Sequence, residues 1–319
     1  MDLPGRSVGS RAVQRDVVEF TNQLWGEHRG VAHSLLPTPV SLSVDDIETL
    51  RAQQYAWSWK TDGVRYQLLL TTNDKGENEA FCIDRKQTVR RLRNDRISPR
   101  ETVQAPAFLA VGNIQIDVYE GSVIDVEYTG CGRWTVLDVV AVGGYSLRNV
   151  LSFKDRIGIV DLLWGDDSFV SNKEWFPMAT APSVDPTQYP TEQDGIIFMP
   201  VRGPIRTGLH ANMFKLKWHH TVDLLWKDGA WRWVRNGMLQ PVPYDVQVDA
   251  PRCAIDRPGV YELAIDAAPD AIEPGEIPRL DVSVVIQRHD KSVPNEFHTV
   301  QAAVRDTKSP ITPGDIWGR

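Results

Sequence analysis

Hydrophobic residues near the N-terminus recur every three to four positions, which is the spacing of one face of a helix. This spacing predicts an amphipathic helix over residues 12–25, AVQRDVVEFTNQLW. The apolar residues that would form its buried face are Val13, Val17, Phe20 and Leu24. An extended connector, LLPTPVSLS at 35–43, comes next and ends at Ser43. The acidic segment behind it, DDIETLRAQ, predicts a second helix that Ser43 caps.

From residue 55 the spacing of the hydrophobic residues shortens to the two-residue alternation that is typical of β-strands. Runs rich in aromatic and β-branched residues at 55–61 and 64–72 meet at the charged sequence KTDG, and a further strand at 80–85 follows the turn NDKGENE. A second hairpin is predicted from GSVIDVEY and RWTVLDVVAV, which are joined by TGCG. Its glycines allow the positive φ angles of a tight turn. Consecutive hairpins of this kind predict antiparallel sheets.

The pattern changes twice more toward the C-terminus. LSFKDRIGIVDLLWG at 151–165 predicts one helix, a proline-rich loop follows at 175–190, and strands are predicted at 194–201 and 213–218. Beyond Val222 short apolar strands are interrupted by turn residues every 8 to 12 positions, which is typical of a small β-sandwich or barrel. We therefore expect two domains, residues 1–221 and 222–319.

The amino-acid composition and the distribution of charge argue against some classes of function. The 319 residues carry 35 Lys and Arg against 42 Asp and Glu, a net charge of −7, which argues against a general nucleic-acid coat. The cations concentrate in RKQTVRRLRNDR at 85–96 and around KLK at 215–217, so a confined phosphate-bearing ligand fits better than a long duplex. The three cysteines, Cys82, Cys131 and Cys253, form no CxxC pair and are expected to be buried, reduced thiols.

Membrane and secretory signals are not expected. No apolar run approaches the roughly 18 residues that span a bilayer, and the start lacks the apolar core of a signal peptide. The sequence thus predicts a protein that is neither secreted nor membrane-bound.

Seven short motifs carry the candidate chemistry. KTDG alone is weak, because a lysine before Asp-Gly is more often a solvated turn. In chain order the motifs are KTDGVR at 60–65, IDR at 83–85, IDVEY at 124–128, WTVLDVVAV at 134–142, QDGIIFM at 193–199, FKLKW at 214–218 and RHDKSVPN at 288–295.

In this order and spacing the set resembles the covalent nucleotidyltransferase superfamily, and within it the mRNA capping enzymes, or GTP:RNA guanylyltransferases. The resemblance runs from LLPTPVSLS to RHDKSVPN and so covers most of the chain. It implies an α+β fold: a nucleotidyltransferase domain of the ATP-grasp-like, DNA-ligase and capping-enzyme type with antiparallel sheets, and a C-terminal OB-fold β-barrel. Asp194-Gly195, where ligases usually carry Glu-Gly, and the RxDKxxPN pattern are similar to capping enzymes rather than to ligases.

The resemblance implies that Lys60 is the nucleophile that attacks the α-phosphorus of GTP and forms a lysyl-N-GMP intermediate. An ordinary lysine is protonated at pH 7, so neighbouring cations, with Arg65, Lys215, Lys217 and a divalent metal as candidates, are expected to displace its proton. Lys215 and Lys217 alternate with Phe214, Leu216 and Trp218, so on a strand the two lysines share one face. The alternative interpretation is that the two lysines lie on the solvated face of an edge strand.

The remaining candidate residues are assigned by the same resemblance. Glu127 and Asp194 are the expected ligands of Mg²⁺ or Mn²⁺, because hard carboxylate oxygens suit these ions. Val126 replaces the family's glycine before Glu127, so Asp117 and Glu120 are the alternatives to Glu127. The residues expected around the nucleotide and the 3′ side of the lysine pocket are Asp62, Gly63, Arg65, Arg85, Leu137 and Ile197. Arg288, Asp290 and Lys291 would reach the β- and γ-phosphates when the OB-fold closes.

The expected reaction is transfer of GMP from GTP through Lys60 to the 5′-diphosphate end of RNA. Two alternatives stay open: an ATP-dependent polynucleotide ligase with the same lysyl chemistry, and a non-catalytic cap- or RNA-binding relative. No phosphatase loop or methyltransferase motif is found, so RNA triphosphatase and cap methyltransferase are expected to be separate partners, and DNA is not an expected partner. We expect a nuclear protein if the source is cellular, and a cytoplasmic or virion-associated one if it is viral.

Overall fold

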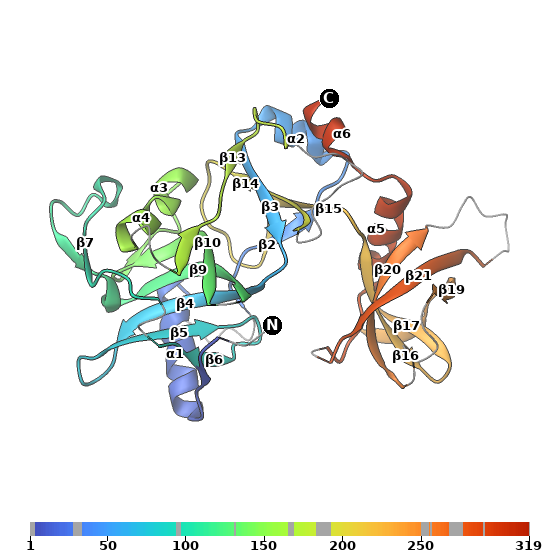
Figure 1. Ribbon diagram of the computed structural model, residues 1–319, viewed down its shortest axis with the longest axis horizontal. Helices are drawn as coiled ribbons and strands as arrows, with labels where there is room; N and C mark the ends of the chain where they lie inside the picture. Colours follow the sequence, from blue (N-terminus) through green and yellow to red (C-terminus); the bar gives the residue numbers. More distant parts are fainter. Residues whose placement is uncertain are drawn as a thin grey trace. The chain divides into compact units, whose positions relative to one another are not determined.

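The computed structural model of the chain describes residues 4–27, 34–93, 97–130, 132–164, 169–182, 193–249, 255, 257–267, 277–289 and 291–318. The chain divides into two compact units, Met1–Leu216 and Lys217–Arg319. Figure 1 colours the first from blue to yellow and the second from yellow to red. Each unit is built mainly from antiparallel strands, as the alternating pattern predicts.

An eight-stranded sheet forms the body of the first unit. Its order is β1-β6-β5-β4-β9-β10-β11, with β12 paired to β10. The bounds of these strands are β1 Arg6–Ser7, β4 Val64–Thr72, β5 Asn78–Ile83, β6 Val89–Arg91, β9 Ser122–Gly130, β10 Arg133–Val142, β11 Tyr145–Ser146 and β12 Val170–Asn172. The two predicted hairpins are confirmed, because β4 pairs antiparallel with β5 and β9 pairs antiparallel with β10.

Both faces of this sheet are buried, which explains the continuous apolar run in β4. Leu68 and Leu70 pack into the core on one face, and Leu69 packs into a second core on the other. Helix α1 (Arg11–Leu24) covers the second face (Figure 1). Its last turn is tied to the sheet by Trp25, whose indole N–H donates to Gln67 at 2.5 Å.

Two helix predictions are wrong in detail. The segment predicted as one helix at 151–165 forms two short helices, α3 (Phe153–Ile157) and α4 (Ile159–Leu163), which meet at Gly158. Gly158 keeps right-handed helical angles, φ −63° and ψ −17°, and its amide bonds to the Lys154 carbonyl, so the interruption is a single residue. Helix α2 (Asp46–Ala52) begins later than expected, and the Ser43 hydroxyl donates to Asp46 at 2.6 Å instead of accepting a bond from a helix amide.

A second sheet of five strands lies in the same unit, in the order β13-β3-β14-β15-β2. Its strands are β2 Thr38–Ser41, β3 Tyr55–Thr61, β13 Phe176–Pro177, β14 Gln193–Pro200 and β15 Leu209–Lys217. A small pair completes the unit, β7 Thr102–Gln104 with β8 Gln115–Asp117, accompanied by the 3₁₀ turns η2 Ala107–Leu109 and η3 Val118–Glu120. The strand β3 that carries Lys60 therefore belongs to a different sheet from β4.

The second unit is a curled sheet with the order β18-β17-β16-β20-β21-β19. Its elements are β16 Thr221–Lys227, β17 Ala230–Arg235, β18 Met238–Pro241, β19 Asp245–Asp249, β20 Gly259–Ala267, β21 Arg279–Gln287, α5 Phe297–Lys308 and α6 Pro313–Trp317. The strands at the two ends of this order, β18 and β19, follow each other in the chain with residues 242–244 between them. Counted as one bent strand, they give the five-strand connectivity of an OB-fold. The predicted fold class is thereby confirmed, whereas α5 and α6 were not predicted.

Two expectations from composition can be compared with the described residues. Cys82 is a free, fully buried thiol, and burial raises its pKa to about 12. Cys131 and Cys253 lie outside the described residues. Within the described part of the chain, no helix has the length and apolar character needed to cross a bilayer.

Candidate active site around Lys60

The KTDG segment connects the two sheets of the first unit. Lys60 lies near the end of β3, in register with Gly195 of β14, and β4 begins at Val64 in the other sheet. The charged turn is therefore a crossover rather than the hairpin end that its local sequence suggests. Asp194 of β14 forms an ion pair with the Lys60 ammonium, and both side chains are partly exposed. The nucleophile candidate thus lies where solvent and a ligand can reach it.

Gly63 is required by a close approach at this crossover. A Cβ atom at position 63 would lie 2.5 Å from Cγ of Glu127 and 3.0 Å from the carbonyl oxygen of Tyr128. Atoms do not approach this closely, so any larger residue would push β9 away from the turn. The preceding residue, Asp62, is exposed. The glycine keeps Glu127 beside the residues that follow Lys60.

Glu127 faces this crossover from β9. The Thr61 hydroxyl donates to its carboxylate, and the Lys173 ammonium lies 3.5 Å from Oε2 of Glu127. The alternative carboxylate Asp117 is used locally, because it accepts a hydrogen bond from the Tyr119 amide and caps η3. Val126 continues the regular strand in the place of the family's glycine. Glu127 is therefore the carboxylate of this segment that contacts the crossover.

Lys173 is a site residue that the motif reading did not identify. It follows β12, is 6% exposed, and donates to Oγ1 of Thr61 at 2.9 Å. Burial lowers the pKa of Lys173, the neighbouring charge of Lys60 lowers it further, and Glu127 opposes both effects. The only sign of this site residue in the sequence is a lone lysine in SNKEWF. Its role becomes apparent only when β12 pairs in parallel with β10.

We expect Lys173→Met to shift the pH dependence of any covalent labelling at Lys60. The ammonium form of Lys60 would lose a repelling neighbour, so the acid limb of the pH profile should move to higher pH. Labelling with radioactive nucleotide across pH 6 to 10 measures this shift. Lys173→Arg keeps the charge and serves as the control. An unchanged profile for Lys173→Met would show that the two ammonium groups are not coupled.

Arg65 is largely buried, and three of the five N–H groups of its guanidinium bind protein oxygens. Its guanidinium forms a bidentate pair with Asp125, with Nε at 2.8 Å from Oδ1, and Nη1 donates to the Pro37 carbonyl at 2.5 Å. Burial opposes the charge, but the bonded Asp125 carboxylate outweighs burial and raises the pKa of Arg65. Arg65 therefore stays charged, and its side chain fixes the connector at Pro37 to the sheet. Asp125 was not identified from the sequence, although it lies in the IDVEY motif.

Arg85 follows β5 and lies within electrostatic reach of this cluster. Loss of hydration and then the charge of Arg65 lower the pKa of Arg85, and the carboxylates of Asp125 and Glu127 oppose this. The two arginines predicted around the nucleotide are therefore brought into one region. One of them is neutralised by Asp125, whereas Arg85 is exposed to solvent.

Two of the residues expected around the nucleotide, Ile197 and Leu137, are largely buried apolar side chains. Ile197 is 8% exposed and packs with Phe153, Met199 and Met213. Leu137 is 5% exposed and sits at a bulge of β10, between the register pairs Val136↔Val126 and Asp138↔Asp125. Any contact of these residues with a base remains a prediction.

The lysine pair of β15 alternates as predicted. Phe214 and Leu216 are buried, whereas Lys215 and Lys217 are partly exposed. The register places Lys215 opposite Ser41 of β2. This arrangement presents both ammonium groups on the less buried side of the strand.

The RHDKSVPN motif of the second unit is organised by a buried carboxylate that the sequence reading missed. Asp223 of β16 forms ion pairs with Lys291 and, at 3.4 Å, with Arg288, which also reaches Glu262 at 3.1 Å. The last residue of the motif, Asn295, accepts a bond from the Asp223 amide at 2.7 Å. Arg288 and Asn295, the first and last residues of the motif, are thus both bonded to Asp223. Asp290 lies outside the described residues.

We expect Asp223→Asn to release Arg288 and Lys291 while the backbone bonds to Asn295 remain. Because these ion pairs are only partly shielded from solvent, the cost in unfolding free energy should be about 1–2 kcal/mol. Urea denaturation measures this cost. Glu262→Gln, which alters only the more exposed partner of Arg288, is the matched control. Equal effects of the two substitutions would contradict a central role of Asp223.

Comparison with known proteins shows that part of this chain matches a protein family. Residues 8–162 match the family described as mRNA capping enzyme, catalytic domain. Residues 8–162 form a domain of the mRNA capping enzyme family. The matched region includes Lys60, Arg65, Arg85 and Glu127, so the resemblance inferred from the motifs is confirmed.

One curated relative and two solved structures illustrate the similarity. An mRNA-capping enzyme of Danio rerio is 26% identical over 305 residues, which covers 86% of this chain and 47% of that protein. The chain thus spans about half the length of this capping-enzyme relative. Among solved structures, Pmar-Lig_PreS3 has a TM-score of 0.40 at 11% identity, covering 86% of this chain and 72% of that one. The ligase domain of LigD from M. tuberculosis has a TM-score of 0.34 at 17% identity, covering 80% and 94%.

Proposed function

We propose that this protein is an mRNA guanylyltransferase that transfers GMP from GTP to the 5′-diphosphate end of RNA. The observation that carries the proposal is the position of Lys60 within a domain of the capping enzyme family. It lies at the crossover between two sheets, paired with Asp194 and next to the Thr61, Glu127 and Lys173 cluster. This is a partly exposed amine surrounded by charged and polar groups that can bind phosphate.

In the first step, the deprotonated Lys60 amine attacks the α-phosphorus of GTP. An N–P bond forms, the bond to the β-phosphate oxygen breaks, and pyrophosphate leaves. The immediate partner of Lys60 is an anion, Asp194, which holds the ammonium group in place until its proton is lost. The cation Lys173, held behind Thr61, favours loss of that proton by repulsion. Lys215, Lys217, Arg288 and Lys291 are proposed to bind the phosphates, together with the motif residue Asp290.

In the second step, the β-phosphate oxygen of diphosphate-ended RNA attacks the phosphorus of lysyl-GMP. The N–P bond breaks, a P–O bond forms, and Lys60 is regenerated as an amine. Arg65 acts indirectly in our proposal, because its guanidinium is paired with Asp125 and bonded to the Pro37 carbonyl and so holds β4 and the connector in place. Arg85 is the exposed arginine that can reach the nucleotide.

Glu127 and Asp194 are the residues that would hold Mg²⁺ or Mn²⁺. Their carboxylates contact the adjacent residues Thr61 and Lys60, so both face one short segment. No group of three or more His, Cys, Asp or Glu side chains with metal-binding geometry occurs among the described residues. Two carboxylates suit Mg²⁺, which usually takes its other ligands from water and substrate phosphates. When bound, such an ion would neutralise charge on the α-phosphate.

Labelling with α-³²P nucleotides tests the proposed function. Incubation with GTP and a divalent metal should give a covalently labelled protein, and addition of 5′-diphosphate RNA should move the label to the RNA end. Labelling by ATP alone, with sealing of nicked strands, would identify a polynucleotide ligase. A folded protein that no nucleotide labels would instead be a non-catalytic relative. Either result would end the guanylyltransferase proposal.

A further inference from the structure

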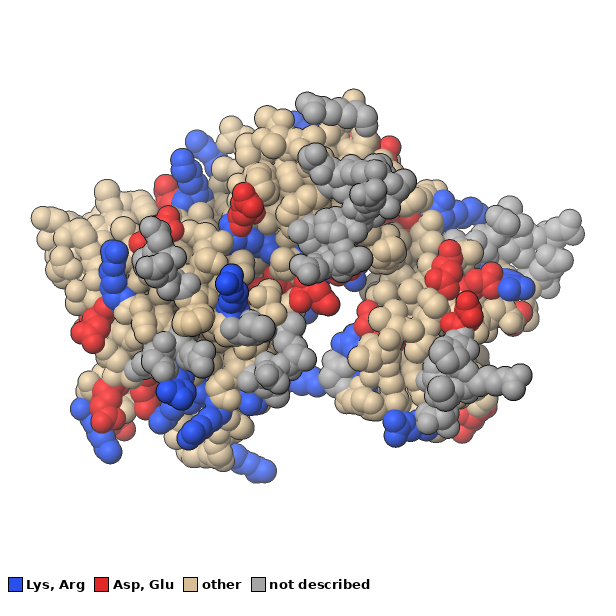
Figure 2. Space-filling view, in the orientation of Figure 1, with Lys and Arg blue, Asp and Glu red and all other residues tan. Residues whose placement is uncertain are grey.

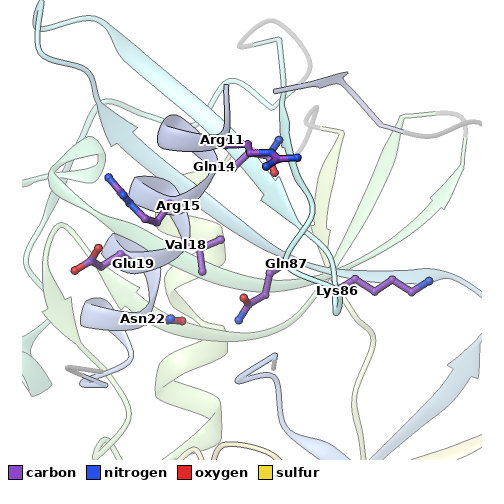
Figure 3. Close-up of a pocket in the computed structure, with 8 residues that line it drawn as sticks. All are labelled: Arg11, Gln14, Arg15, Val18, Glu19, Asn22, Lys86 and Gln87. Carbon is purple, nitrogen blue, oxygen red and sulfur yellow. The ribbon is translucent and has the colours of Figure 1, made fainter. Parts of the chain in front are cut away.

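A groove runs along helix α1 on the first unit, away from the Lys60 crossover in sequence. It has a volume of about 640 Å³ and is lined by Arg11, Gln14, Arg15, Val18, Glu19, Asn22, Lys86 and Gln87. Figure 3 shows six of these side chains on one helix and two on the facing turn between β5 and β6. This volume falls within the roughly 300–1,000 Å³ of sites that hold small ligands.

The facing turn has a defined shape. The Asp84 carboxylate accepts hydrogen bonds from the amides of Lys86 and Thr88, each at 2.8 Å. Gln87 adopts a left-handed backbone with a φ of 61°, which is uncommon for a residue other than glycine. These bonds hold Lys86 and Gln87 at the edge of the groove.

The groove is cationic on a protein of net charge −7. Its lining includes Arg11, Arg15 and Lys86 against the single carboxylate Glu19. Arg11 and Arg15 are four residues apart, so they lie on one helix face at about 5–6 Å between Cβ atoms. Arg15 also pairs with Asp16, but both side chains are more than half exposed, and such a pair holds the guanidinium weakly. In Figure 2, Lys and Arg side chains lie along the lower edge where α1 and β6 are found.

The other lining groups suit a nucleic-acid backbone. Gln87 brings an amide group, which can donate to phosphate or exchange hydrogen bonds with a ribose 2′-hydroxyl. The Gln14 amide donates to the Val8 carbonyl, and Asn22 is buried. Val18 is the only apolar side chain of the lining, so the groove offers little to an apolar peptide face. Lys86 directly follows Arg85, which is within electrostatic reach of Arg65 and Glu127. The groove therefore continues from the same turn that supplies a candidate nucleotide contact.

We propose that this groove binds the phosphate backbone of the acceptor RNA, downstream of the 5′ end that receives GMP. The proposal rests on the proposed function for the identity of the ligand. Arg11, Arg15 and Lys86 contact successive phosphates, and the Gln87 amide adds a contact that does not depend on base sequence. The groove thereby raises the affinity for long RNA acceptors without taking part in the reaction with GTP.

The test uses the full chain with Arg11→Glu, Arg15→Glu and Lys86→Glu combined. Anisotropy of 3′-labelled, 5′-diphosphate RNA of about 20 nucleotides should show at least a tenfold weaker affinity, and the slope of log K against log salt should fall by about 2, since each lost single-strand contact contributes about 0.7. Lysyl-GMP formation and transfer to a diphosphate trinucleotide should be unchanged. The matched control reverses three exposed cations of the same unit, Lys75, Arg100 and Lys154, and should bind RNA like wild type.

The alternative outcomes are distinct. RNA binding equal to that of the control would overturn the proposal, as would loss of binding to an acidic phosphopeptide with RNA binding intact. If the charge reversal impairs folding, the corresponding triple alanine variant is measured, and a weaker affinity for RNA with normal thermal unfolding still supports the groove. Absence of GTP labelling in wild type would end the guanylyltransferase proposal, while the direct RNA-binding comparison would still decide the role of the groove.

Discussion

Replacing Lys60 with alanine should abolish the covalent GMP adduct, a loss of at least about a thousandfold in labelling, because no other group can form the N–P bond in its place. Mass spectrometry of the labelled wild-type peptide should locate GMP on Lys60. Gel labelling with α-³²P GTP measures the loss in the variant.

Lys60→Arg is the sharper variant. It keeps a cation opposite Asp194 and so preserves the ion pair, but a guanidinium stays protonated and does not attack phosphorus. It should be as inactive as Lys60→Ala with a thermal unfolding midpoint near that of wild type. Label retained on Lys173, the nearby lysine whose pKa is lowered, would show that the nucleophile was assigned to the wrong side chain.

The largest effect on stability should come from Arg156→Met. The Arg156 guanidinium is buried in the first unit, binds both oxygens of Asp138 at 2.9 Å, and donates to the carbonyls of Val150 and Gly203. Removing one partner leaves the Asp138 carboxylate buried and unpaired, and loss of such a partner costs about 3–5 kcal/mol. Urea denaturation followed by tryptophan fluorescence measures this change.

Two controls separate charge loss from packing. Arg15→Ala breaks an ion pair that is exposed to solvent, and should change the unfolding free energy by less than about 0.5 kcal/mol. Arg156→Met combined with Asp138→Leu removes both charges and should recover part of the loss. A cost below about 1 kcal/mol for Arg156→Met alone would show that Asp138 finds other partners.

The local sequence was sufficient to predict an element where the spacing of its apolar residues reflects a single environment along the element. The 3.6-residue pattern predicted α1, and the turns NDKGENE and TGCG predicted the two hairpins that the structure contains. Local sequence was insufficient where a short segment depends on its surroundings. The helix predicted at 151–165 divides at Gly158 into α3 and α4, and α5 and α6 were missed because their short amphipathic patterns follow a loop-rich stretch.

The candidate site divides in the same way. Lys60, Arg65, Glu127 and Asp194 were found because they occur in motifs of fixed order, which is a property of the linear chain. Asp125, Lys173 and Asp223 were missed because each matters only through a partner far away in sequence. Lys173 meets Thr61 across 112 positions, and Asp223 meets Lys291 across 68. A buried charge requires a partner, and sequence spacing does not reveal which one it has.

The sequence by itself determined the strand-rich fold, the motif order and the lysine that would bind GMP. These follow from side-chain periodicity and from residue types at short spacing. Only the tertiary structure decided that KTDG crosses between two sheets instead of closing a hairpin, that Arg65 is paired with Asp125, and that α1 and the β5–β6 turn line a cationic groove. The physical reason is that strand pairing and charge pairing act between segments distant in the chain. Several arrangements are equally compatible with the local sequence, and tertiary packing determines which of them forms.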